Sequence, residues 1–343
     1  GTYCETPTIS AVGYNCILTS AWANKHNVWD NSPKPDYSYW SIFRIAKEQK
    51  RDVTTALYSS WTDNRTVLLG EGKPETGNLK IDYVFDGYDN DKTNFPNKPG
   101  DFHIFDIDAH VCAEAAKNIR TNAPDLNWVY LWYTDDAFHI KGNGEHSDWS
   151  VTATDSLLRD VWEAVKYREK NNDEEWLVII VTDHGRGNDG HNHGGQSARE
   201  RTVWMATNLK KRNAQFGRPT LSHTDILPTI CEFMDFDVPD DVLYELDGTS
   251  FYGKNDIYDL QAAQYDDKAI LSWKCDNLKA AAWIYMATTN NKATGGKDNW
   301  QKVDEVPAPA GSCIIDLKKY GDSKFYKFAV RTMNNCITRQ LHK

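Results

Sequence analysis

The first 260 residues alternate short apolar runs with amphipathic segments, and this alternation restricts the fold more than any other feature. Residues 128–133 (WVYLWY) and 176–181 (WLVIIV) are uninterrupted apolar runs with polar neighbours, as expected of buried strands. Residues 107–119 and 155–168 form helical patterns. Strands separated by helices in this way are typical of a mainly parallel sheet with helices on both faces. We therefore predict an α/β fold, with further elements at 37–50 (helix), 53–58 (strand) and 223–234 (helix).

A different pattern begins near residue 260, where short β-rich stretches recur between turn sequences such as Asn290–Asn291 and Gly295–Gly296. These features predict a small antiparallel β-sandwich domain of about 75 residues. We expect an α/β domain over residues 1–258 and the β-domain over 266–343, with the linker within 253–267. The expected strands are 268–274, 281–287, 312–317 and 325–332.

Charge and cysteine content exclude several classes of protein. The chain has 39 Lys and Arg against 49 Asp and Glu, a net charge of −10, which argues against binding to a nucleic-acid duplex. A small phosphate ester stays compatible, because a bound metal can supply positive charge locally. No apolar run approaches the length of a membrane span. The seven cysteines contain no CxxC pair and allow at most three disulfides, and we expect Cys275 and Cys336 near each other on adjacent strands.

Polar residues with metal-ligand chemistry follow the two apolar runs. Asp183, His184 and Gly185 come directly after residues 176–181, at the carboxyl end of a predicted strand, where α/β folds place their sites. A carboxylate and an imidazole are zinc ligands, and the glycine lets the chain turn tightly. The alternative interpretation is an ordinary turn in which the aspartate caps a helix.

Two further pairs have the same chemistry. Asp135 and His139 follow residues 128–133 at a spacing of four, which aims both side chains at one point, and Asp136 is an alternative ligand. His191 and His193 lie in a glycine-containing loop further on, and we prefer His193 because it directly precedes two glycines. Three such patterns after successive strands predict one metal centre.

In this order, Asp-x-x-x-His, Asp-His-Gly and His-Gly-Gly resemble the metal-binding pattern of the alkaline phosphatase superfamily. The chain is most similar to the type I phosphodiesterase/nucleotide pyrophosphatase branch, over about residues 3–250. Residues 8–20 (TISAVGYNCILTS) and 26–31 (HNVWDN) resemble the family's nucleophile region. The resemblance implies Ser10 as the nucleophile and Asn31 as the residue that binds the transferred phosphoryl oxygen. It assigns Asp135, His139 and His193 to one zinc, and Asp183 and His184 to the other.

The chain also departs from the family's pattern. Thr8 is a second candidate nucleophile, and Ser20 and Asn27 stand where the family usually has glycine. The family places a further ligand Asp on a strand well before the nucleophile, and only nine residues precede Ser10 here. Either that strand and its Asp lie upstream of the residues given, or the protein has an incomplete metal site.

The resemblance implies an extracytoplasmic hydrolase of small phosphate esters, which holds two Zn²⁺ or other divalent ions and forms a phosphoserine at Ser10. A hydrolase of this kind is expected to be secreted, periplasmic or on the cell surface. In agreement with such a location, Asn64 begins a glycosylation sequon. Candidate cations for an extra phosphate charge are Lys92, Lys98, Arg186 and Arg199. A monoester would need one of these cations to hold its extra charge, and no spacing singles one out. A diester is therefore slightly favoured over a monoester.

Two alternatives remain to be compared with this hydrolase. A sulfatase is disfavoured because Ser10 is not followed by the x-Pro-Ser-Arg sequence that formylglycine formation needs. The second alternative is a catalytically degenerate member of the same fold that serves as a binding or structural module. In either case the C-terminal domain, with the chain's many tryptophans, is a candidate for glycan or protein contact.

Overall fold

The computed structural model describes residues 6–321, 323 and 325–342. Its internal contacts divide the chain into two compact units. The first unit takes in the chain up to Gly13, Trp29–Pro35 and Phe43–Asn208, and the second comprises Tyr14–Val28, Asp36–Ile42 and Leu209–Lys343. The expected domain boundaries, 1–258 and 266–343, stay a prediction.

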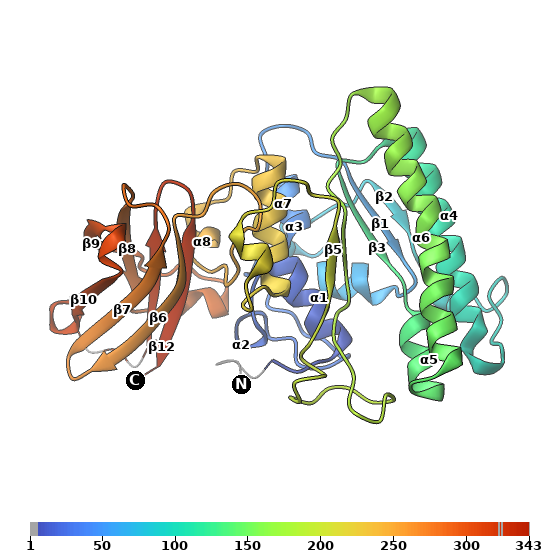
Figure 1. The fold of residues 1–343 in the computed structure, drawn as a ribbon, viewed down its shortest axis with the longest axis horizontal. Coiled ribbons are helices and arrows are strands. Elements are labelled where there is room, and N and C mark those ends of the chain that lie inside the picture. Colours follow the sequence, from blue (N-terminus) through green and yellow to red (C-terminus); the bar gives the residue numbers. More distant parts are fainter. Residues whose placement is uncertain (1–5, 322, 324, 343) are drawn as a thin grey trace. The chain divides into compact units, whose positions relative to one another are not determined.

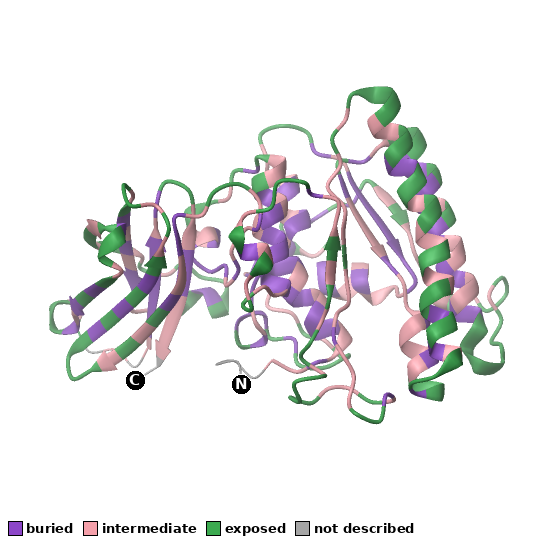
Figure 2. Cartoon of the chain, in the orientation of Figure 1, coloured by how far each residue is buried: buried purple, intermediate pink, exposed green. Residues whose placement is uncertain are grey.

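The first unit is built on a three-stranded parallel sheet in the order β2-β1-β3 (Figure 1). The central strand β1 (Thr55–Ser59) pairs with β2 (Tyr83–Phe85) and β3 (Leu126–Tyr130), and all five of its residues are buried (Figure 2). Helix α4 (Phe102–Asn122) packs on β1 and β3, and α6 (Glu145–Asn172) packs on α4. The predicted α/β architecture with a parallel sheet is thus confirmed for this unit, with helices longer than the sequence pattern indicated.

Two predicted strands differ from expectation. The run 128–133 is divided, because β3 ends at Tyr130 and helix α5 (Tyr133–Lys141) begins three residues later. The run 176–181 contains only β4 (Ile179–Val181), which pairs antiparallel with β5 (Met205–Thr207) in a separate two-stranded sheet. Its residues are half-buried or exposed, so the prediction of a buried parallel strand is wrong. Upstream in this run, Trp176 and Val178 pack on a cluster between α4 and α6, which explains their apolar character.

The remaining helices are short. The predicted helix over 37–50 is reduced to α3 (Ile42–Lys47), since the Asp36 carboxylate accepts hydrogen bonds from the backbone N–H and hydroxyl of Ser38 and fixes a turn there. Helix α7 (Ile226–Met234) confirms most of the helix predicted at 223–234. The others are α1 (Ser10–Thr19), α2 (Ala23–His26), α8 (Asp240–Leu243), a π-helix η1 (Asn64–Leu69) and the 3₁₀ turns η2 (Pro74–Thr76), η3 (Tyr88–Asn90), η4 (Pro99–Asp101), η5 (Ala214–Gly217), η6 (His223–Asp225), η7 (Asn291–Thr294), η8 (Ala308–Ala310) and η9 (Leu317–Tyr320).

The C-terminal part of the second unit contains two antiparallel sheets, in the orders β10-β7-β6 and β12-β11-β8-β9. All four predicted strands are present, within one residue at each end. The segment expected to be a linker, 253–267, instead contains β6, because Ile257 and Leu260 enter the core. The strands are β6 (Ile257–Tyr265), β7 (Lys268–Cys275), β8 (Ala281–Ala287), β9 (Gln301–Pro307), β10 (Ser312–Asp316), β11 (Phe325–Arg331) and β12 (Cys336–His342).

One apolar cluster draws on both of these sheets. Burial alternates along β7, where Ala269, Leu271 and Trp273 face inward, and Figure 2 shows the resulting bands. The expectation that Cys275 and Cys336 lie on adjacent strands is wrong, because they lie on β7 and β12, in different sheets; both are free cysteines. Among the described residues, none of the helices combines the length and apolarity needed to cross a bilayer.

Candidate metal centre

Helix α5 presents Asp135 and His139 one turn apart, and a buried aspartate fixes where this helix starts. The carboxylate of Asp108, on α4, accepts hydrogen bonds from the backbone N–H groups of Trp132 and Tyr133 and from the Ser60 hydroxyl. Burial raises the pKa of Asp108 to about 6. A carboxylate at this position satisfies the first donors of the helix and complements its dipole. Asp108 was not singled out from the sequence, although a lone acid on an apolar helical face is a signal that could have found it.

Asp183, His184 and His193 lie in the segment 182–204, which connects β4 to β5 without helix or strand. The backbone at Gly185 approaches the backbone at Arg199 closely, because a Cβ atom at Gly185 would lie 2.1 Å from the carbonyl oxygen of Arg199. The Gly185 N–H donates to the Glu200 carbonyl at 2.8 Å, and the Glu200 carboxylate accepts from the Gly195 N–H at 2.8 Å. Gly185 is therefore required by a close backbone approach as well as by the turn that the sequence indicated.

Ser10 is the first residue of α1, and another glycine lets this helix approach the centre. A Cβ atom at Gly13 would lie 2.5 Å from the carbonyl oxygen of Asp183. With glycine at that position, the Ser10 hydroxyl oxygen lies 3.2 Å from Nε2 of His184. Asn31 is close to the same helix end, since its Oδ1 accepts a hydrogen bond of 3.0 Å from the Ala11 N–H.

Thr8, the alternative nucleophile, is engaged in holding the loop of His193. Its hydroxyl donates to the Gly195 carbonyl and accepts from the Gly194 N–H, both at 2.9 Å. Its carbonyl oxygen lies 2.8 Å from Nδ1 of His193. These contacts engage the hydroxyl and carbonyl of Thr8 with the loop of His193, whereas the Ser10 hydroxyl faces an imidazole nitrogen of the cluster.

The five expected ligands converge. Asp135, His184 and His193 each offer a ligand atom within 4.8 Å of the other two. His139 adjoins this group, with its Nε2 3.1 Å from Nε2 of His193 and 3.3 Å from Oδ2 of Asp135. Asp183 adjoins it on the other side, with its Oδ2 3.4 Å from Nε2 of His184. The tightest group thus combines Asp135 and His193, expected on one zinc, with His184, expected on the other.

The donor set suits a divalent metal. The rings of His184 and His193 are stacked at 3.7 Å, and the pKa of His193 is lowered by burial and by the neighbouring His184, which favours the neutral form that binds metals. Two imidazole nitrogens at 3.1 Å, as in His139 and His193, can share at most one proton between them, so one presents a lone pair. Two carboxylates and three imidazoles are ligands that zinc accepts.

One cation, Arg186, reaches into this centre. Its guanidinium contacts the Asp135 carboxylate and donates to the carbonyl oxygens of Asp135 at 2.8 Å and His191 at 2.6 Å. Burial lowers its pKa from the ordinary value. Of the other candidate cations, Lys98 pairs with Asp106, and Arg199 donates to Asn143 at 3.1 Å.

The two positions where the family usually has glycine both have left-handed backbone. Ser20 has φ +53° and Asn27 has φ +59°. Glycine adopts this conformation without steric cost, and asparagine tolerates it better than most residues. At Ser20 the side chain compensates, because its hydroxyl donates to the Thr224 carbonyl at 2.7 Å and accepts from the Gly248 N–H at 3.2 Å.

Comparisons with known proteins give limited guidance. No family model matches the chain, and no curated protein sequence matches it. Among solved structures it is similar to the phosphonate monoester hydrolase SpPMH from Silicibacter pomeroyi, with 11% identity, a TM-score of 0.46 and coverage of 99% of this chain and 81% of that one. It also aligns with OgpA from Akkermansia muciniphila, with 10% identity, a TM-score of 0.18 and coverage of 88% and 97%. Neither score establishes a common fold, so the resemblance to the alkaline phosphatase superfamily depends on the motifs and on the geometry of their residues.

Proposed function

We propose that this chain is a metal-dependent phosphoric ester hydrolase of the alkaline phosphatase superfamily, similar to its type I phosphodiesterase branch. The observation that carries the proposal is the position of the Ser10 hydroxyl, 3.2 Å from His184, at the edge of a cluster of two carboxylates and three imidazoles. Ser10 is the nucleophile, and the substrate is a small phosphate ester.

Two divalent ions, zinc by preference, would be held by this cluster. Asp135, His139 and His193 would hold one ion, and Asp183 and His184 the other. Bound there, the metal would lower the pKa of the Ser10 hydroxyl and offset the negative charge of the phosphoryl group.

The chain's own residues orient the reaction. Ser10 is the first residue of a ten-residue helix, where backbone N–H groups and the helix dipole favour a negatively charged group. Because Oδ1 of Asn31 already accepts from the Ala11 N–H, the amide nitrogen of this exposed side chain is the part that can donate to a phosphoryl oxygen. Ser10 Oγ attacks phosphorus, the bond to the leaving alcohol breaks, and water then hydrolyses the phosphoserine.

The substrate is better matched by a diester than by a monoester. A monoester carries additional charge, which needs a cation besides the metals. Arg186 is committed to Asp135 and to the His191 carbonyl, while Lys98 and Arg199 have partners of their own. An extracytoplasmic setting, a β-sandwich arrangement of the two C-terminal sheets and a glycan or protein contact through them complete the proposal.

The second candidate function is a catalytically degenerate member of this fold that acts as a binding or structural module. One observation favours it: the guanidinium of Arg186 contacts a carboxylate oxygen of Asp135 that a metal would need. In this case the cluster would hold itself together through that ion pair, without a divalent ion.

Metal analysis and hydrolysis assays separate the two. We expect the purified protein to bind Zn²⁺ and to hydrolyse a chromogenic phosphodiester faster than the corresponding monoester or sulfate. Ser10→Ala should lower kcat by about 10³-fold or more, as loss of a nucleophile does in other hydrolases. Thr8→Ala is the matched hydroxyl variant and should lower turnover less than Ser10→Ala, because it removes only the hydroxyl bonds that hold the loop of His193. A protein that binds no divalent metal and hydrolyses none of the three substrates would support the degenerate module, and activity that survives Ser10→Ala but not Thr8→Ala would make Thr8 the nucleophile.

A further inference from the structure

The outward face of the second C-terminal sheet carries large aromatic side chains. On β8, Ala282, Ile284 and Met286 point into the core, so the alternate residues Trp283 and Tyr285 share the opposite face. Both side chains are half-buried. Trp283 and Tyr285 therefore stand side by side on the face of the sheet that is turned away from its core.

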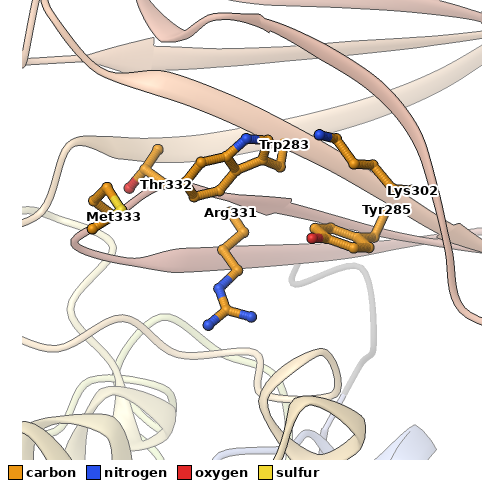
Figure 3. A pocket seen from close by; sticks show the side chains of 6 residues that line it. All are labelled: Trp283, Tyr285, Lys302, Arg331, Thr332 and Met333. Atoms are coloured by element: carbon orange, nitrogen blue, oxygen red, sulfur yellow. The ribbon is translucent and has the colours of Figure 1, made fainter.

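The strand register places one cation beside each aromatic residue. On one side Arg331 of β11 lies opposite Trp283, and on the other side Lys302 of β9 lies opposite Tyr285. With Thr332 and Met333, these four residues line a cavity of about 500 Å³ (Figure 3). This volume is within the range of small-ligand sites.

The ring of Tyr285 is held by a neighbouring aromatic residue. The ring of Tyr285 stacks on that of Tyr244 at 4.9 Å with an interplanar angle of 29°, and Tyr244 in turn contacts Trp300 at 5.1 Å. Tyr244 is buried. The orientation of the Tyr285 ring is therefore set before any ligand arrives, which lowers the entropic cost of binding.

The charges around the cavity are balanced. Arg331 donates to Asp240 Oδ1 at 2.7 Å, and Lys302 donates to Glu305 Oε2 at 2.5 Å. Because each cation has an acidic partner, the site has little net attraction for a phosphate or a carboxylate. It offers hydrogen-bond donors and acceptors side by side, the arrangement that hydroxyl groups can satisfy with both their proton and their lone pairs.

We propose that this cavity is a binding site for a neutral oligosaccharide, separate from the hydrolase site. The C–H face of a pyranose ring packs on Trp283 and Tyr285, as apolar groups do on aromatic surfaces. Ring hydroxyls accept from Arg331 and Lys302 and donate to the carboxylates of Asp240 and Glu305. The chain thereby holds a glycan through its C-terminal sheet, whichever ester the first unit acts on.

The test measures binding of the full chain to neutral and acidic oligosaccharides. Cello-, xylo-, malto- and chitooligosaccharides of up to six units are titrated by calorimetry, alongside oligogalacturonate and inorganic phosphate. We expect at least one neutral series to bind, with affinity that rises with chain length. Trp283→Ala should weaken this binding at least tenfold, consistent with loss of a central aromatic anchor. Trp204→Ala is the matched control, because Trp204 is an exposed tryptophan (55%) outside the cavity.

Three outcomes would overturn the proposal. The first is that no neutral oligosaccharide binds, and the second is that Trp283→Ala binds as tightly as the wild type while near-UV circular dichroism shows a native fold. The third is that oligogalacturonate or phosphate binds more tightly than every neutral sugar. Self-association that is abolished by Trp283→Ala, without sugar binding, would instead identify this face as a protein interface.

Discussion

The two units each contain a cluster of ionisable side chains, and the clusters differ in what their members do for one another. In the first unit, the metal-ligand cluster (Asp135, His139, Asp183, His184 and His193) is partly exposed, with the Asp135 and His139 side chains 28% and 38% accessible. In the second unit, the buried charge network (Lys25, Glu245, Asp247, Asp298 and Lys327) has side chains that are 1–3% accessible.

The buried charge network is complementary. Lys327 Nζ lies 2.6 Å from Oε1 of Glu245 and 2.8 Å from Oδ2 of Asp298. Lys25 Nζ lies 2.7 Å from Oδ1 of Asp247. In the metal-ligand cluster, by contrast, the ring nitrogens of His139 and His193 face each other, and the pKa of His193 is lowered by burial and by the neighbouring His184. The charges of the buried network are therefore paired within the protein, so removal of one partner should be costly. The metal-ligand cluster brings like groups together, which is consistent with the metal site proposed above.

The largest effect is expected from breaking the network. Lys327→Met would remove the nearest cation from both Glu245 and Asp298, leaving Glu245 only Lys25 at 3.9 Å. Removal of one partner of a buried ion pair typically costs about 3–5 kcal/mol. We expect this loss in the free energy of unfolding measured with urea. Lys318→Met is the control, because Lys318 and Asp267 form an exposed pair on the same C-terminal domain. Equal stability of the two variants would show that the buried network contributes no more than a surface pair.

Removing a ligand from the other cluster should affect metal binding instead. Asp135→Asn keeps the shape of the side chain but loses the charge, so we expect Zn²⁺ affinity to fall by about 100-fold or more, since loss of an outer-shell partner alone costs about 10–100-fold. Unfolding of the metal-free protein should change little. Asp136→Asn is the neighbouring control, because Asp136 accepts from the Trp132 indole and is not among the converging ligands. Similar zinc affinities for the two variants would remove Asp135 from the ligand set.

A smaller effect, dependent on pH, comes from His26 in the second unit. Burial lowers its pKa to about 3, and its Nδ1 accepts a hydrogen bond of 3.1 Å from the Val28 N–H, which requires a neutral ring. Below pH 6.5 the unfolded chain binds a proton here and the folded chain does not, so stability falls as the pH falls. The loss from this residue should reach about 2 kcal/mol at pH 5.

The control for this prediction is His26→Asn, whose Oδ1 can accept from the same N–H without titrating. The difference in unfolding free energy between pH 7 and pH 5 should shrink by about the same 2 kcal/mol in the variant. An unchanged pH dependence would mean that His26 is protonated in the folded protein, contrary to its hydrogen bond.

The sequence predicted those parts that depend on local pattern. The helix patterns at 107–119 and 155–168 and four of the seven strands β6–β12 follow from local pattern, which side-chain direction determines. The candidate ligands could be proposed from the sequence because their residue types and short spacings, such as Asp135 to His139, are visible locally.

Other features depend on partners far along the chain. The run 176–181 reads as a buried strand, but only the folded protein shows that one side of it stays exposed, with Ile180 38% accessible. Asp108 acts on a helix start more than twenty residues away, and Lys25 meets Asp247 across most of the chain. The sequence offered Arg186 as one of four candidate cations. Its contact with Asp135 joins residues far apart in the sequence, so no local spacing could single it out.

The segment between β4 and β5 has a kinetic consequence. It supplies Asp183, His184 and His193 from 23 residues without helix or strand, numbers 182–204, while Asp135 and His139 sit on one helix. Segments of this kind open locally at much lower free energy than the whole protein unfolds. Such opening would separate the ligands of the loop from those of α5 in a single event. The frequency of that opening, rather than the strength of any one bond, would then set how fast the centre exchanges its ion with the surrounding solution.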